Sequence, residues 1–263
     1  MKGGTSPLGY TIIEVLIVLA ASGMMFVIAG TFINGKQAKT SFTSGVNEFA
    51  SRIQDTIDQV TDGQYSDIKV NCKAVSGGID FPLGTPNEVG TNAECFFLGK
   101  VMHFSVSGNK DKYDVISVAG RRLQSDNLTP VENDLSQISP KAIPGLTINQ
   151  SVPQALDVGN ITLHGSALGT TSYGIAFYQN VVGGGDTSSG AQTAPEVYAI
   201  HSITGNKNTV QGEQQVSNVA QTRLVDNVTI CVTDGARSAN VIIGVGNSQH
   251  NVTVRMLGEV PCP

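Results

Sequence analysis

The chain is poor in charged residues and has no excess of basic ones. Its 263 residues include 16 lysines and arginines against 21 aspartates and glutamates, a formal net charge of −5. A nucleic-acid partner requires a basic face that releases counterions from phosphates, and this balance does not supply one. We therefore expect no nucleic acid among the partners. A charged fraction of only 14% beside 30 glycines favours a β-rich extracellular domain over a cytosolic helical enzyme.

Cysteine is also scarce, and its spacing argues against two common kinds of site. The four cysteines are Cys72, Cys95, Cys231 and Cys262, and none forms the CxxC spacing of a zinc knuckle or a thioredoxin-like centre. Four cysteines allow three pairings, and we predict the local one, Cys72–Cys95 with Cys231–Cys262. Disulfides presume an oxidising compartment outside the cytoplasm. The alternative is four reduced, buried thiols.

Motifs for catalysis, metals and cofactors are missing as well. The four histidines are widely separated and belong to no metal or triad motif: His103, His164, His201 and His250. The glycine run at 183–185 lacks the Gly-Lys-Ser/Thr ending of a phosphate-binding loop, which favours a plain loop. Oxygen atoms of Asn109, Asp111 and Asp114 could serve calcium, but a polar turn is the default interpretation. We predict neither enzymatic activity nor a cofactor or metal.

The N-terminus, in contrast, carries a long apolar run. From Ile12 to Ile33 nearly every residue is apolar, small or hydroxylated. As a helix this stretch is about 33 Å long, which matches a bilayer core of about 30 Å. A secretory signal peptide fits poorly, since the run is too long and no small-x-small cleavage site closes it. An ordinary membrane anchor fits the run but leaves one residue, Glu14, unexplained.

Glu14 is a carboxylate near one end of the apolar run. Such a charge costs on the order of 3 kcal/mol at the bilayer centre and less near its edge, so it usually has a partner. A cut between Gly9 and Tyr10 would create an α-amine one helical turn before Glu14. This amine could meet Glu14 of the same chain, or neutralise Glu14 of a neighbouring chain during assembly.

The sequence Gly9-Tyr10-Thr11-Ile12-Ile13-Glu14 before an unbroken apolar run resembles the class III signal of type IV pilins and type II secretion pseudopilins. In that family a membrane aspartyl peptidase cuts after the glycine and methylates the new N-terminus. The resemblance implies that Gly9 is the cleavage-site residue, Tyr10 the methylated first residue and Glu14 the carboxylate for subunit docking. Two departures are tyrosine in place of the commoner phenylalanine, and Leu8 before the glycine.

Past the apolar run, residues at intervals of three and four form one apolar stripe: Phe42, Val46, Phe49, Ile53, Ile57 and Val60. This spacing predicts that the helix continues to about Thr61 and ends at the Asp62-Gly63 stop signal. The chain then divides into a cleaved leader (1–9), a transmembrane and filament-core helix (10–33), an amphipathic helix half (34–62) and an extracytoplasmic β-rich domain (63–263).

The β-rich part shows alternating apolar residues and turn signals. Ala93–Val106 and Tyr113–Arg121 predict a hairpin, whereas Asn127–Pro153, with four of the ten prolines, predicts a connecting loop. Further strands are expected at 160–164, 172–182 and 196–204, followed by a three-stranded meander at 228–232, 241–245 and 252–256. The expected fold class is α+β and pilin-like, a long N-terminal helix packed on an antiparallel β-rich domain.

The resemblance implies a structural subunit of a type IV pilus-like filament, a minor pilin or pseudopilin processed by a prepilin peptidase. Expected partners are other pilin subunits, the peptidase, the inner-membrane assembly platform and, before assembly, membrane lipids. A leader whose side chains include only one charge, Lys2, favours a cytoplasmic N-terminus. The chain would then cross the cytoplasmic membrane once, with its C-terminal domain outside, before joining a pilus or pseudopilus at the cell surface. The alternative is a tip adhesin or a DNA- or receptor-binding minor pilin.

Overall fold

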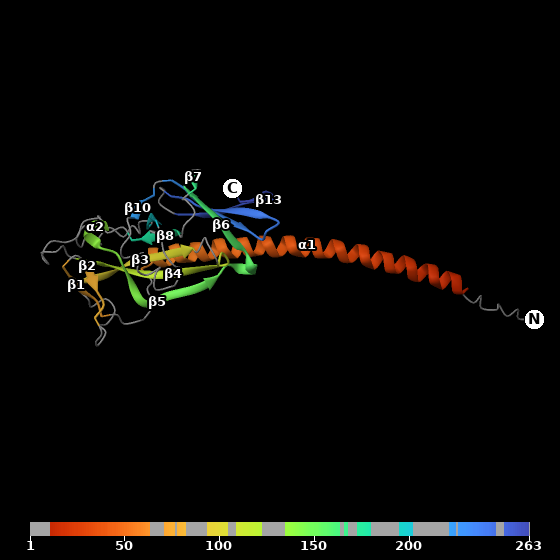
Figure 1. Cartoon of the computed structure of the whole chain (residues 1–263), viewed down its shortest axis with the longest axis horizontal. Coiled ribbons are helices and arrows are strands. Elements are labelled where there is room, and N and C mark those ends of the chain that lie inside the picture. Colours follow the sequence, from red (N-terminus) through yellow and green to blue (C-terminus); the bar gives the residue numbers. More distant parts are fainter. Residues whose placement is uncertain are drawn as a thin grey trace, which may run out of the picture. The chain divides into compact units, whose positions relative to one another are not determined.

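The computed structural model describes residues 11–63, 71–76, 78–82, 94–104, 109–122, 135–163, 166–167, 173–179, 195–201, 221–224, 226–245 and 250–262. The chain splits into two compact units, Met1–Ser44 and Gly45–Pro263. The first unit holds the apolar helical stretch. The second combines the last turns of the same helix with antiparallel β-structure, so the fold is of the α+β kind (Figure 1).

Helix α1 runs from Ile12 to Thr61 and ends where the sequence predicts. Gly63 takes the left-handed conformation with a φ of 65°, and its N–H donates to the Val60 carbonyl at 3.1 Å. Glycine is common just after a helix because it has no Cβ to strain this conformation. Gln179 adds a second donor to the same carbonyl at 3.0 Å. The last turn of α1 therefore accepts hydrogen bonds both from the residue that follows the helix and from the β-rich part of the chain.

The larger sheet has six antiparallel strands in the order β10-β9-β8-β3-β4-β5. Their bounds are β3 (Cys95–Phe104), β4 (Lys112–Arg121), β5 (Lys141–Ser151), β8 (Tyr173–Tyr178), β9 (Glu196–His201) and β10 (Gln221–Arg223). The predicted hairpin is confirmed as β3 and β4, and β8 and β9 match two more of the expected strands.

The second sheet has five antiparallel strands in the order β13-β12-β11-β6-β7. Their bounds are β6 (Asp157–Leu163), β7 (Ser166–Ala167), β11 (Val228–Thr233), β12 (Ser238–Ile243) and β13 (Val252–Gly258). The predicted C-terminal meander is confirmed as β11, β12 and β13. A separate two-stranded hairpin joins β1 (Lys73–Val75) to β2 (Gly78–Asp80).

The expected loop at Asn127–Pro153 is wrong in its second half, which contains the short helix α2 (Leu135–Ile138), strand β5 and the start of a 3-10 turn (Pro153–Ala155). The alternation of β5 is broken at Pro144 and Gly145, where the pairing register with β4 also shifts. A proline is tolerated there because β5 is the edge strand of its sheet. Because the alternation of apolar and polar residues is interrupted, this eleven-residue strand was not predicted from the sequence.

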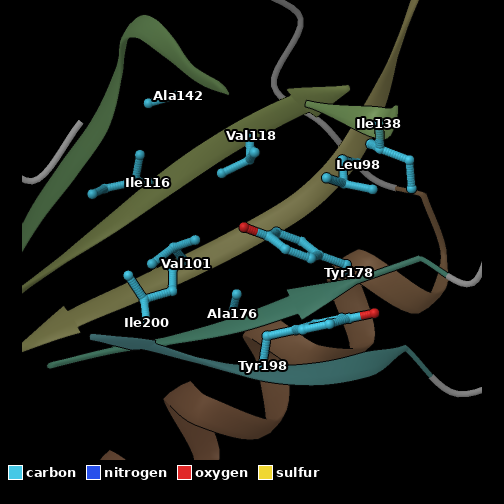
Figure 2. Packing of buried hydrophobic residues seen from close by; sticks show 10 residues of the cluster. All are labelled: Leu98, Val101, Ile116, Val118, Ile138, Ala142, Ala176, Tyr178, Tyr198 and Ile200. Atoms are coloured by element: carbon cyan, nitrogen blue, oxygen red, sulfur yellow. The ribbon is translucent and has the colours of Figure 1, made fainter. Parts of the chain in front are cut away.

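One face of the six-stranded sheet carries an apolar cluster contributed by five strands and α2 (Figure 2). It consists of Leu98, Val101, Ile116, Val118, Ile138, Ala142, Ala176, Tyr178, Tyr198 and Ile200. The rings of Tyr178 and Tyr198 lie 5.4 Å apart between centroids. Since successive side chains of a strand point to opposite faces, the neighbours of these residues on β3 and β4 face the other way.

That opposite face receives the last turns of α1, from Gly45 to Thr61. Phe49 lies edge-on to Phe104 of β3 at 6.3 Å and to Tyr113 of β4 at 5.6 Å between ring centroids. The predicted apolar stripe is buried throughout this unit, with exposures of 2% or less at Val46, Phe49, Ile53, Ile57 and Val60. Gln54 reaches the second sheet and accepts the N–H of Val252 at 3.0 Å. The stripe is thus the core-facing side of the helix.

Lys100 is an ammonium group buried on this interface. Lys100 as a whole is 9% exposed, and its Nζ donates a hydrogen bond to the side-chain oxygen of Gln59 on α1. Burial lowers the pKa of Lys100 from its usual value of 10.5, because removing a charge from water disfavours the charged form. The pKa of Tyr113, which packs against Phe49 of α1, is shifted in the opposite direction, since burial raises the pKa of its phenol from 10.0.

We expect the free energy of unfolding to rise with pH over the range just below 10.5, the usual pKa of a lysine, because the pKa of Lys100 is lowered in the folded protein. In this range the folded protein gives up the Lys100 proton before the unfolded chain does, so the unfolded state binds more protons and stability increases with pH. Urea unfolding of the full chain in detergent measures the slope. Lys100→Met should remove it, and Lys112→Met, at an exposed position of β4, should leave it unchanged. A flat wild-type profile would contradict the prediction.

Candidate functional site

The most distinctive surface of the described chain is the N-terminal part of α1. Residues Ile12–Gly30 form a stretch of 19 residues with a mean hydropathy of 2.5, and none of it is buried. Its large side chains are open, with 81% of Ile12 and 79% of Phe26 exposed. At about 1.5 Å per residue its length approaches the thickness of a bilayer core. This is one helix long and apolar enough to span a membrane.

Glu14 is the sole ionisable side chain within Ile12–Gly30. Its Oε2 accepts the backbone N–H of Thr11 at 3.0 Å and the Thr11 hydroxyl at 3.1 Å. In return, the Thr11 Oγ1 accepts the backbone N–H of Glu14 at 3.3 Å. These reciprocal bonds form a capping box, which satisfies N–H groups that have no partner within the first turn of a helix.

The capping box gives Glu14 a role that sequence reasoning missed. The signal was present, because Thr11-Ile12-Ile13-Glu14 has the T-x-x-E spacing of the motif. A carboxylate in the first turn also interacts favourably with the helix dipole. Glu14 therefore lies at the N-terminal edge of the apolar stretch, held by its own chain.

Ser22 is the hydroxylated residue within the same stretch, and it too is satisfied locally. Its Oγ donates to the carbonyl of Val18 at 2.6 Å, one turn earlier. A hydroxyl bonded in this way can lie in hydrocarbon without an external partner. Glu14 is consequently the one side chain of the stretch whose charge calls for a partner beyond it.

The other two residues of the expected N-terminal site, Gly9 and Tyr10, lie outside the described residues. The structure therefore describes Glu14 but not the peptide bond that the resemblance marks for cleavage.

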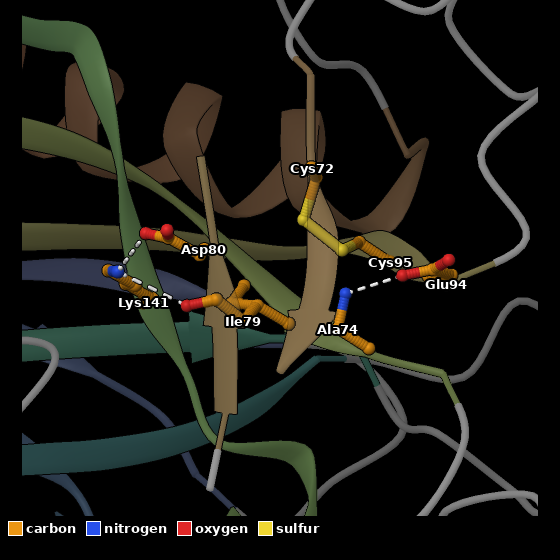
Figure 3. The surroundings of a disulfide bond; sticks show 7 residues. All are labelled: Cys72, Ala74, Ile79, Asp80, Glu94, Cys95 and Lys141. Carbon is orange, nitrogen blue, oxygen red and sulfur yellow. Dashed lines mark hydrogen bonds and ion pairs between the residues drawn. A yellow bond between two sulfur atoms is a disulfide. The ribbon is translucent and has the colours of Figure 1, made fainter. Parts of the chain in front are cut away.

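The first disulfide joins Cys72 to Cys95, one of the two local pairs that the sequence predicts. It ties the β1–β2 hairpin to the start of β3 (Figure 3). Lys141 of β5 holds the other side of the hairpin, donating to the Ile79 carbonyl at 3.1 Å and to the Asp80 carboxylate at 3.2 Å. This bond lowers the pKa of the Asp80 carboxyl. The hairpin is thus fixed to both β3 and β5.

The second disulfide joins Cys231 of β11 to Cys262 in the C-terminal segment, the other local pair. Gly159 of β6 makes room for it, because a Cβ there would lie 2.8 Å from the Cys262 sulfur. The Ser238 hydroxyl also bonds the Val260 carbonyl. The C-terminal segment is therefore fastened to the five-stranded sheet at two points.

The three histidines that the structure describes do not gather into a metal-binding site. His103 of β3 lies 3.8 Å from Asp114, its cross-strand neighbour on β4. Both ring nitrogens of His250 contact backbone carbonyls, those of Gly244 at 2.8 Å and of Pro195. His201 lies at the end of β9. His164 and the glycine run at 183–185 lie outside the described residues.

The residues considered for calcium are Asn109, Asp111 and Asp114. Backbone hydrogen bonds join the first two to the start of β4 and to the residue before the 3-10 turn. The Asp111 carbonyl accepts the Val152 N–H at 2.7 Å, and the Asn109 carbonyl accepts the Lys112 N–H at 3.2 Å. Across the part of the chain that the structure describes, no three His, Cys, Asp or Glu side chains come together in a way that would hold a metal ion. These bonds give the turn a structural role.

Comparison with known proteins gave no match to any family model, to any curated protein or to any solved structure. The features that bear on function are therefore those of the chain itself: the exposed apolar helix with Glu14 at its edge, and a disulfide-linked β-rich unit.

Proposed function

We propose that this chain is a structural subunit, a minor pilin or pseudopilin, of a type IV pilus-like filament. The observation that carries the proposal is the position of Glu14. It is the sole ionisable residue in the exposed apolar stretch Ile12–Gly30 and lies five positions after Gly9. An ordinary anchor could use Glu14 for helix capping, which a neutral glutamine can also do, whereas a docking subunit needs the charge of the carboxylate.

In this proposal a prepilin peptidase cuts between Gly9 and Tyr10 and methylates the new amine. The amine of an incoming subunit then approaches Glu14 of a subunit already in the filament. A carboxylate in the membrane costs up to about 3 kcal/mol, less near the edge, and a cationic partner offsets that cost. Assembly is favoured because it supplies a cation that the capping box with Thr11, a neutral partner, does not.

The same proposal assigns each remaining part a place. Before assembly the apolar stretch holds the chain in the cytoplasmic membrane, and the β-rich unit lies outside, where its two disulfides are stable. In the filament the apolar helices pack together and the β-rich units face outward. The assembly platform and the other pilin subunits are then the partners.

The sharpest test separates the charge of Glu14 from its capping role. Glutamine at this position can still complete a capping box but carries no charge. We expect Glu14→Gln to be processed normally, yet to enter filaments at least about tenfold less than wild type, since the loss of one charged pair exceeds 1.4 kcal/mol. Immunoblots of sheared filaments and of membranes measure the two pools.

Thr11→Val is the matched control, because it removes the capping hydroxyl and keeps the Glu14 charge. It should weaken the start of the helix by about 1 kcal/mol, and filament entry should remain close to wild type. Normal assembly of Glu14→Gln together with failure of Thr11→Val would assign Glu14 to helix capping alone and refute the docking role.

A further inference from the structure

The part of α1 that follows the apolar stretch carries a basic pair, Lys36 and Lys39. These lysines are the only ionisable residues between Glu14 and Glu48. Both are exposed, and at a spacing of three they share one side of the helix. Within the residues that the structure describes, neither lysine takes part in an ion pair. The basic pair therefore presents two positive charges to its surroundings.

An acidic row lies at the C-terminal end of the same helix. It consists of Asp55, Asp58 and Asp62, which follow one another at intervals of three and four and are all exposed. The Asp58 carboxylate accepts a hydrogen bond from the Gln54 amide at 2.9 Å. None of the three carboxylates forms an ion pair with another described residue. Like charges at this spacing repel one another, so a cationic partner would stabilise the row.

The cations near the acidic row do not cancel its charge. Arg52 is paired with Glu48, one turn earlier, at 2.6 Å between Nη2 and Oε1. Lys100 also reaches this part of α1, where its ammonium donates to Gln59. Counting Lys100 against the three aspartates leaves two negative charges. The acidic row thus matches the basic pair in the size of its charge and opposes it in sign.

Two complementary groups at separate places on one chain favour a particular kind of self-association. Contact between the group of one copy and the other group of the next is heterologous, and such contacts build an open helical filament unless the rotation closes a ring. Copies anchored in one membrane hold α1 in the same direction, so their helices pack in parallel. In register, parallel helices would bring lysine to lysine and aspartate to aspartate, which is unfavourable.

A shift along the helix removes this repulsion. Moving one copy by nineteen residues places Lys36 beside Asp55. The same shift places Lys39 beside Asp58, because the two lysines and the two aspartates have equal spacing. The charge pattern of α1 therefore favours staggered over in-register packing, as complementary charges set the register of other interfaces.

We propose that the basic pair of one subunit binds the acidic row of a second copy of this chain, with a stagger of nineteen residues between the two helices. The inference rests on the proposed filament function and deepens it by naming the partner of the exposed side of α1. The contact involves a different neighbour from the one that meets Glu14, because the new amine would lie only four positions before that residue.

Reversal of the basic pair tests this contact in the full chain. Lys36→Glu with Lys39→Glu replaces two attractions by two repulsions, so we expect normal processing but about tenfold less entry into filaments. The neutral variant, Lys36→Gln with Lys39→Gln, loses only the attractions and should fall between the reversed variant and wild type. Intact-mass spectrometry of membranes measures processing, and immunoblots of sheared filaments measure entry. Entry of the reversed variant at the wild-type level overturns the inference.

The reciprocal change tests whether the partner is a copy of the same chain. Asp55→Lys with Asp58→Lys should show the same defect. Combining all four substitutions should restore entry to within about threefold of wild type, since every copy then carries both reversed groups. Failure of this restoration overturns the inference, because it assigns the basic pair to another kind of subunit or to lipid. If the aspartate variant does not fold, the lysine series decides: equal entry of the neutral and reversed variants shows that the sign of the charge has no effect and overturns the inference.

Lys73→Glu with Lys112→Glu is the matched control, because it reverses two exposed lysines of the β-rich unit and changes the net charge by the same amount. It should enter filaments like wild type. Equal depletion of this control would assign the effect to net charge and overturn the inference. Absence of the wild-type chain from filaments would overturn the proposed function and the inference together. Normal entry of both wild type and the reversed lysine variant overturns the inference alone.

Discussion

Replacing Gly9 by alanine should leave the whole population of this protein as an uncut precursor that retains its N-terminal leader. The resemblance to prepilins implies cleavage directly after a glycine, where the absence of a Cβ lets the backbone come close to the peptidase. A methyl group at that position obstructs the approach at the scissile bond itself. Intact-mass spectrometry of the membrane fraction measures the outcome, since precursor and product differ by residues 1–9 and one methyl group.

Gly4→Ala is the matched control, because it makes the same chemical change within the leader but away from the cut. It should be processed like wild type. If the wild-type protein from membranes or filaments still carries Met1, or if Gly9→Ala is cut as fast as wild type, the prepilin interpretation is wrong.

Processing and docking can be told apart because the two steps use different residues. Gly9→Ala denies the chain its free amine, and Glu14→Gln denies it the carboxylate that the amine would meet. Both variants should be strongly depleted from filaments, but only the first should have the precursor mass. In the proposed function, each variant removes one member of the same charged pair.

Local patterns in the sequence predicted the helix well. The stripe that includes Phe49 and Ile53 and the stop signal at Gly63 depend on spacing within a few turns, and both are confirmed. The same holds for the C-terminal meander, whose strands carry apolar residues at alternating positions over part of their length and pair with their neighbours in sequence. Features whose cause lies within about ten residues are readable before the fold is known.

Apart from the two disulfides, features that depend on distant partners were not predicted. Strand β5 is irregular at Pro144 and Gly145, and it forms because Ala142 and Ile143 are buried when it pairs with β4. A cavity lined by Lys110, Asn160, Arg237 and Cys262 draws its walls from four separate regions of the chain. No window of sequence contains such a site. The capping box at Thr11 and Glu14 is different, since its spacing was visible and only its meaning was overlooked.

Gly99 is the clearest case of a residue that is constrained by a neighbouring strand far away in the sequence. It lies on β3 at the point where the register with β4 shifts, and it pairs with Tyr178 of β8. A Cβ built on Gly99 would lie 2.0 Å from the carbonyl oxygen of Phe177. That oxygen belongs to the backbone of a central strand, so it cannot rotate away as the end of a side chain can.

We expect Gly99→Ala to prevent stable folding of the β-rich unit. Relieving the overlap requires β3 and β8 to separate by more than 1 Å, roughly the shift from 2.0 Å to an ordinary contact. Separation on that scale breaks ladder hydrogen bonds in the middle of the six-stranded sheet and opens the tightly packed cluster around Val101 and Ala176. The loss should exceed about 4 kcal/mol, beyond what most single substitutions cause.

Limited proteolysis and thermal unfolding of the full chain in detergent measure this effect. Gly78→Ala on β2 is the control, because its added methyl would meet its nearest neighbour, the Cβ of Ser139, at an ordinary contact distance of 3.7 Å. That variant should unfold within a few degrees of wild type. Equal resistance of Gly99→Ala and Gly78→Ala to protease would show that β3 and β8 can move apart without disturbing the core, and the sheet pairing described here would then be wrong at its centre.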